Sequence, residues 1–239
     1  MGTRLRTVLV GALVSAVVVV GLAGPAGARS ASGDRKIAKA GVLLSSDFPA
    51  GFAGKPSTAE SDAAVAKLAK GIPACAQYTA LKKATDQQPQ AKSLEYEDST
   101  RQVSNEVDVF PSAAAAGGAL ALYAKKSVPT CLDRLFTKLL TQTYAKDPQT
   151  KGKIAGIKVT ITPQAVSGLG DNSVVYEGNA QITGKDGTTQ QIGLGNAAVL
   201  AGRAVSDFTY VTTGAGLNEV LQPAVVASVA RLRDALSRS

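Results

Sequence analysis

Glu95 and Glu97 are the residues of this chain whose type and spacing come closest to a catalytic pair. The segment 93–98, Ser-Leu-Glu-Tyr-Glu-Asp, alternates in polarity, which predicts a strand. Residues two apart on a strand share a face about 7 Å from each other, a separation at which carboxylate pairs hydrolyse glycosides. An exposed strand face explains the same pattern. It is the preferred interpretation, because nothing in the sequence places the two glutamates in a cleft.

The other chemistry that the chain offers is narrow. Histidine is absent from the 239 residues, which removes the usual base for a Ser or Cys nucleophile and the usual ligand for zinc. The Ser-x-x-Lys, Gly-x-Ser-x-Gly and phosphate-loop motifs are missing as well. We therefore expect a protein that is not an enzyme and that needs neither a metal nor a cofactor.

Two further groups of residues have both a functional and a structural interpretation. Asp171 follows glycines in the turn 168–171 and suits a cation loop, but a Gly-Asp turn before a strand is far commoner. Tyr176, Phe208 and Tyr210 would form an aromatic wall for a ligand. Packing of these rings on a sheet face is the preferred interpretation, so neither group is assigned to a site.

Cys75 and Cys131 are the only cysteines, and each stands beside a predicted helix. An even number of cysteines in an exported protein predicts one disulfide. Closing a loop of about 57 residues would stabilise the fold by roughly 4 kcal/mol in the chain-entropy account. A reactive or metal-binding pair is the alternative, but a redox pair normally has the close Cys-x-x-Cys spacing, which this chain lacks.

Residues 1–28 have the three parts of a signal peptide. Arg4 and Arg6 make the start positive, residues 8–24 are almost wholly apolar, and Ala-Gly-Ala at 26–28 forms a cleavage site. An uncleaved anchor is the alternative, since about 17 apolar residues just suffice to span a membrane. In either case we expect a secreted protein or one at the extracytoplasmic cell surface, with transient membrane contact through this segment.

The exported part carries a moderate positive charge. The whole chain has 26 basic and 18 acidic residues, and residues 1–28 contain two of the arginines, so the remainder has a net charge of 24 − 18 = +6. A field of this sign suits contact with anionic wall polymers or lipid head groups. The basic residues are scattered and have no aromatic platform or recognised motif beside them, which argues against nucleic acid as a partner.

The body of the chain mixes helices and strands. The segment 103–110 places four residues from Val103 to Val109 on one face and Glu106 and Asp108 on the other, which is typical of a half-buried strand. Ser57 and Glu60 have capping-box spacing at the start of a helix. The other expected helices are 37–44, 58–70, 113–123, one around 132–140 and one starting near Pro223, and the other expected strands are 157–162, 173–183, 188–200 and 203–212.

These elements predict an α+β fold. Short connections, including a hairpin turn at Asp186-Gly187, make the later strands antiparallel neighbours. The helix around 132–140 has a stripe of large apolar residues that must cover a sheet or another helix: Leu132, Leu135, Phe136, Leu139 and Leu140. We predict an antiparallel sheet of about five or six strands with helices packed mainly on one face. The domain plan is a signal peptide at 1–28, a flexible leader at 29–36 and one domain at 37–239.

Three stretches resemble the PknH-type extracellular sensor domain family and its actinobacterial secreted or lipoprotein relatives that lack the kinase domain. They are the strand and two helices of 107–135, the segments 170–176 and 196–210 of a central hairpin, and the closing helix of 223–236. The resemblance implies a helix-and-sheet domain with a groove for an unidentified extracellular ligand. This chain departs from the family in cysteine number, because the kinase-attached domain has two disulfides and two cysteines can form only one. No binding residue is carried over from the family.

The sequence therefore favours an exported, non-enzymatic binding or sensor-like domain of the cell envelope. Its ligand, a lipid or wall component, would lie in an apolar groove between the sheet and the helix around 132–140. Two alternatives stay open: a carboxylate-dependent wall glycan hydrolase using Glu95 and Glu97, and a cationic structural protein that binds wall polymers.

Overall fold

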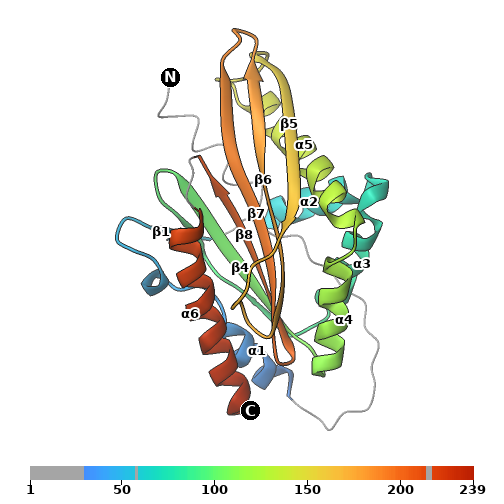
Figure 1. Ribbon diagram of the computed structural model, residues 1–239, viewed down its shortest axis with the longest axis vertical. Coiled ribbons are helices and arrows are strands. Elements are labelled where there is room, and N and C mark those ends of the chain that lie inside the picture. Colours follow the sequence, from blue (N-terminus) through green and yellow to red (C-terminus); the bar gives the residue numbers. More distant parts are fainter. Residues whose placement is uncertain (1–29, 57–58, 214–216) are drawn as a thin grey trace.

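The computed structural model describes residues 30–56, 59–213 and 217–239, with backbone only at 59–63 and 217–220. Its helices are α1 (Ala31–Ala40), α2 (Ala59–Lys70), α3 (Ala76–Thr85), α4 (Ala113–Tyr123), α5 (Ser127–Lys146) and α6 (Leu217–Ser237), with single 3₁₀ turns η2 (Ser45–Asp47) and η3 (Pro73–Cys75). Its strands are β1 (Ala53–Lys55), β2 (Gln90–Lys92), β3 (Glu95–Glu97), β4 (Arg101–Val109), β5 (Ile154–Gln164), β6 (Asn172–Gly184), β7 (Thr189–Ala201) and β8 (Ala204–Thr212) (Figure 1). The predicted signal peptide and the side chains of the predicted capping box lie outside the described residues.

The strands form one open antiparallel sheet in the order β1-β3-β4-β8-β7-β6-β5, with β2 also paired to β4. The α+β class is confirmed, and the sheet is larger than the five or six strands predicted. The difference lies in β1 and β2, each of three residues, which are too short for alternation to reveal them, whereas β3 lies within the strand predicted at 93–98. Long β5, β6 and β7 extend past the rest of the sheet, as the upper part of Figure 1 shows.

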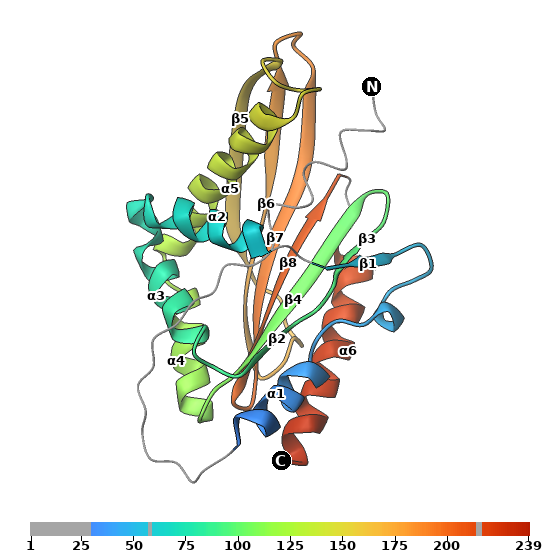
Figure 2. The same ribbon diagram turned by 180° about the vertical axis from the view of Figure 1, so that it is seen from behind.

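Helices cover both faces of the sheet. Helices α2 to α5 share one apolar cluster with β5 to β8, while α1 and α6 share a second cluster with β4 and β8 (Figures 1 and 2). We call these the α4 face and the α6 face. Four of the six described helices therefore lie on the α4 face. Helices α1 and α6 cover the α6 face, so β4 and β8 are buried on both of their faces. None of the described helices combines the length and hydropathy needed to span a bilayer.

Residues 31–36 belong to helix α1 and not to a flexible leader. Ser30 caps this helix, because its hydroxyl accepts a hydrogen bond from the backbone N–H of Gly33 at 3.1 Å. Asp34 then forms an ion pair with the nearly buried Arg203 at 2.6 Å. The cap is local, but the ion pair joins residues 169 positions apart, so the sequence alone gave no reason to dock this segment.

Two prolines lie deeper in their elements than predicted. The strand expected at 157–162 continues through Pro163, which is paired with Tyr176 inside β5. Because β5 is the edge strand, a missing N–H can point away from the ladder. Pro223, expected near a helix start, lies inside α6.

Candidate functional site

The α4 face of β4 is a row of buried polar side chains. Gln102, Ser104, Glu106 and Asp108 alternate with the valines that pack on the α6 face, and each is at most 5% exposed. The sequence placed Glu106 and Asp108 on the solvent side of a half-buried strand, and this part of the prediction was wrong. The strand is buried on both sides, so carboxylates that looked like ordinary surface residues lie in the interior.

Asp207 on β8 lies directly opposite Glu106 on β4 in the strand register. Directly opposed residues on one face of an antiparallel pair have Cβ atoms about 4.5–5.5 Å apart, and like charges in that position repel. Two lysines moderate the repulsion. The Lys92 ammonium lies 3.4 Å from Glu106 Oε2. The Lys82 ammonium, on α3, lies 3.4 Å from Asp86 Oδ1 and also attracts the charge of Asp207.

Asp207 also belongs to a closed triangle of hydrogen-bonding groups. The Tyr123 hydroxyl oxygen lies 2.5 Å from Asn196 Oδ1 and 2.9 Å from Asp207 Oδ2, and Asn196 Nδ2 donates to Asp207 Oδ1 at 2.8 Å. Three contacts need three protons. The phenol supplies one and the amide nitrogen supplies one, so all three contacts are hydrogen bonds only in molecules in which Asp207 carries a proton.

The electrostatic environment favours the same protonation state. Burial raises the pKa of Asp207 to about 7, with a further rise from Glu106, although Tyr123 and Asn196 pull it down. Burial, together with the charges of Glu106 and Asp207, holds the pKa of Asp108 well above its usual range. Perturbed carboxyl groups of this kind gather at functional sites and also in structural networks.

Two side chains in this row have a polar atom without a hydrogen-bond partner among the described residues. They are the Ser104 hydroxyl and Oδ1 of Asp108, both in residues that are 2% exposed. Such atoms normally cost stability. The described residues contain no group of three or more His, Cys, Asp or Glu side chains placed to hold a metal ion.

The predicted pair Glu95 and Glu97 is bridged by a lysine. Lys55 on β1 places its ammonium 3.2 Å from Glu95 Oε1 and 2.7 Å from Glu97 Oε2. Glu95 is buried rather than exposed, and burial raises its pKa while Lys55 lowers it. The bridge gives this pair a clear structural role, since it ties β1 to β3 at the edge of the sheet.

The other residues singled out from the sequence have structural surroundings. Asp171 accepts a hydrogen bond from the Gly202 N–H at 2.6 Å and pairs with Arg233, which lowers its pKa. Phe208 is packed in the core of the α6 face. Tyr176 is buried on the α4 face and donates to the carbonyl of Tyr123 at 2.7 Å, so the three aromatic rings do not share one wall.

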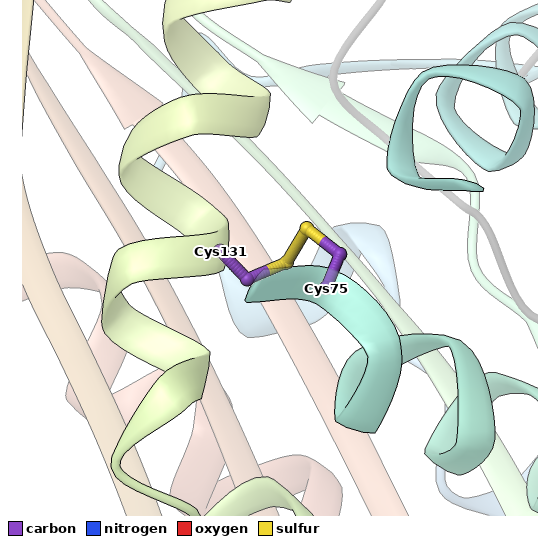
Figure 3. Close-up of a disulfide and its surroundings, with 2 residues drawn as sticks. All are labelled: Cys75 and Cys131. Carbon is purple, nitrogen blue, oxygen red and sulfur yellow. A yellow bond between two sulfur atoms is a disulfide. The ribbon is translucent and has the colours of Figure 1, made fainter. Parts of the chain in front are cut away.

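Cys75 and Cys131 form the expected disulfide, with Cα atoms 4.7 Å apart. Figure 3 shows the bond joining the turn η3, just before α3, to helix α5. Both residues are fully buried among apolar side chains. The bond is therefore placed to fasten the helical layer of the α4 face.

The apolar stripe of α5 is packed in the core rather than lining an open groove. Leu132, Leu135, Phe136, Leu139 and Leu140 are all at most 5% exposed and belong to the cluster of the α4 face. A half-open pocket of about 750 Å³ begins one turn beyond them, at Tyr144. It is lined by Tyr144 and by residues drawn from 149–154 and 182–190, and we call it the hairpin pocket.

The hairpin pocket has an apolar floor. Tyr144 and Ile182 are buried, Ile154 is half-buried, and apolar surface predominates in the lining. The Tyr144 hydroxyl is buried without a hydrogen-bond partner among the described residues, and burial raises its pKa to about 12. No role was predicted for residues 149–154 from the sequence, and the length of the β6–β7 hairpin was the one local signal of this site.

No protein-family model and no curated protein matches the chain. Six chains of solved structures do match, among them the extracellular domain of PknH from Mycobacterium tuberculosis. That domain is 13% identical, with a TM-score of 0.33, and the match covers 61% of this chain and 63% of the domain. The chain therefore matches less than two thirds of that domain. Nothing is concluded from this weak likeness, and function is inferred below from the residues of this chain.

Proposed function

We propose that this chain is an exported, non-enzymatic binding or sensor-like domain of the cell envelope. The hairpin pocket carries the proposal. Its volume of about 750 Å³ lies in the range of small-molecule sites, roughly 300–1,000 Å³, and its floor is apolar with polar groups around it. The signal-peptide pattern and the buried disulfide support export to an oxidising compartment.

The lining of the hairpin pocket supports binding rather than catalysis. Its titratable side chains are Tyr144, Lys153, Lys185 and Asp186. The Asp186 carboxylate accepts hydrogen bonds from the Thr188 N–H at 3.1 Å and hydroxyl at 2.6 Å, which lower its pKa and commit it to the turn. A general acid and base pair is thus not assembled among these described residues.

A test is to purify the protein from culture medium and identify co-purifying small molecules by native mass spectrometry. We expect a lipid or wall component to accompany the wild-type protein and to be lost from an Ile154→Asp variant, which places a charge on the half-buried edge of the floor. Lys158→Gln, on the exposed side of β5, is the matched control. Equal recovery of the same molecule from both variants would argue against this pocket.

A carboxylate-dependent glycan hydrolase is the second candidate, and the opposed acids Glu106 and Asp207 now favour it more than Glu95 and Glu97 do. They are directly opposed in the strand register, and the pKa of Asp207, raised to about 7 mainly by burial, would suit a general acid. Turnover of a wall glycan that disappears in Glu106→Gln and persists in Glu97→Gln would establish this activity. A third candidate, wall-polymer adhesion through lysines, predicts a pull-down that vanishes at high salt.

A further inference from the structure

We propose that the hairpin pocket takes a single-chain lipid with an anionic head group. This inference rests on the proposed function, since it names the ligand class of the same pocket. The apolar floor formed by Tyr144, Ile154 and Ile182 would hold the chain. The volume of about 750 Å³ is that of one drug-sized ligand, so we assign one chain rather than two.

The charged residues of the lining select the head group. Lys153 and Lys185 come from different segments, and the backbone N–H of Lys185 donates to the carbonyl of Lys153 at 2.8 Å, which holds their backbones side by side. Neither ammonium lies within ion-pair distance of a carboxylate of the described residues. Unlike Lys55 or Lys82, these two lysines have no structural partner to explain them.

The single acid of the lining does not cancel this charge. Asp186 is fastened by Thr188 in the hairpin turn, so two ammonium groups face one committed carboxylate and the lining has a net charge of +1. An anion brought to this lining gains attraction from two cations without having to displace a salt bridge. A neutral head group would gain no such attraction.

The backbone also favours an extended ligand at this place. Gly152 and Gly184 both contribute to the lining, and residue 152 has nothing within 4 Å of the position where a Cβ atom would stand. The main chain is therefore exposed beside the apolar floor, and its polar groups can contact a head group.

The test measures binding of two probes with the same chain, laurate and 1-monolauroylglycerol, by isothermal titration calorimetry on the disulfide-bonded protein. We expect laurate to bind about tenfold more tightly, with this preference shrinking at high salt. In Lys153→Gln/Lys185→Gln we expect laurate affinity to fall about tenfold while the glyceride is unaffected. Lys158→Gln should change neither, and thermal melts establish that each variant is folded.

The outcomes separate this inference from the proposed function. Equal binding of both probes, lost in Ile154→Asp but insensitive to the two lysines, would overturn the anionic class while leaving a binding pocket. Failure of both probes, with no molecule recovered from the secreted protein either, would overturn the pocket as a binding site altogether. Preference for laurate that persists in the double lysine variant would also overturn the proposed role of Lys153 and Lys185.

Discussion

Glu106, which is buried, and Asp207, which is half-buried, lie directly opposite each other on β4 and β8, on the face covered by α4. Two ionised carboxylates in that position would repel, and both Lys92 and Lys82 lie close enough to reduce but not remove the conflict. A proton on Asp207 resolves it, because it removes one of the two charges and supplies the third hydrogen bond of the closed triangle with Tyr123 and Asn196.

This arrangement predicts that stability falls as pH rises through neutrality. The folded pKa of Asp207 is about 7 and its usual value is 3.8, so the folded state holds this proton more tightly than the unfolded state. The stabilisation of the folded state by this proton is fully present below about pH 4 and is lost as the pH rises through about 7. Its upper limit is about 4 kcal/mol of unfolding free energy. Urea unfolding should give a free energy of unfolding about 1–3 kcal/mol lower at pH 8 than at pH 5.

Asp207→Asn is the matched control for that prediction. An amide at this position can donate to the Tyr123 oxygen and accept from Asn196, so it keeps the three contacts without titrating. Its loss of stability between pH 5 and pH 8 should be clearly smaller than that of the wild type. Identical pH profiles for the two proteins would mean that Asp207 is ionised in the folded state.

Removing the disulfide should weaken the fold without removing a catalytic group. Cys75→Ser/Cys131→Ser opens a link between residues 56 positions apart and replaces two fully buried sulfurs. We expect the free energy of unfolding to fall by about 2–5 kcal/mol in chemical denaturation. Reduction of the wild-type protein should lower it similarly, and a stability unchanged by either treatment would contradict the bond.

Tyr144→Phe should stabilise the protein, which is unusual for a core substitution. The hydroxyl that it removes is buried and has no partner among the described residues, so its loss relieves a desolvation cost of about 1 kcal/mol or more. Tyr123→Phe is the counterpart, because its hydroxyl has two partners and its loss should cost about 1–3 kcal/mol. Thermal melts compare the two. A destabilised Tyr144→Phe would indicate a bound water or ligand at that hydroxyl.

Gly195→Ala should be strongly destabilising, because the ring of Tyr210 lies over this position. A Cβ atom at position 195 would stand 1.8 Å from the Tyr210 ring. The ring lies across β7, and the Tyr210 hydroxyl donates to Glu177 on β6 at 2.7 Å. We expect a loss of about 3 kcal/mol or more in urea unfolding, at the upper end for overpacking. Gly117→Ala, in α4 with open space around it, should instead gain about 0.5–1 kcal/mol. Equal effects of both changes would contradict the packing of Tyr210.

Local patterns identified the longer elements well. Strand 103–110 was predicted against the observed Arg101–Val109, and the helix 113–123 matches α4. The same patterns failed at α1, where a polar segment is held by the distant Arg203. They also failed for the exposure of Glu95 and Glu106, because alternation shows that two faces differ but not what covers each face.

The sequence by itself determined the α+β class, the long antiparallel strands and the only pair of cysteines that can join, because each depends on local periodicity, turn chemistry or a count. Tertiary structure alone decided which acids became neighbours. Glu106 meets Asp207 only because β8 lies next to β4, and Lys55 reaches Glu95 only because β1 joins the edge of the sheet. Such contacts depend on strand order and register between distant segments, which no local pattern contains.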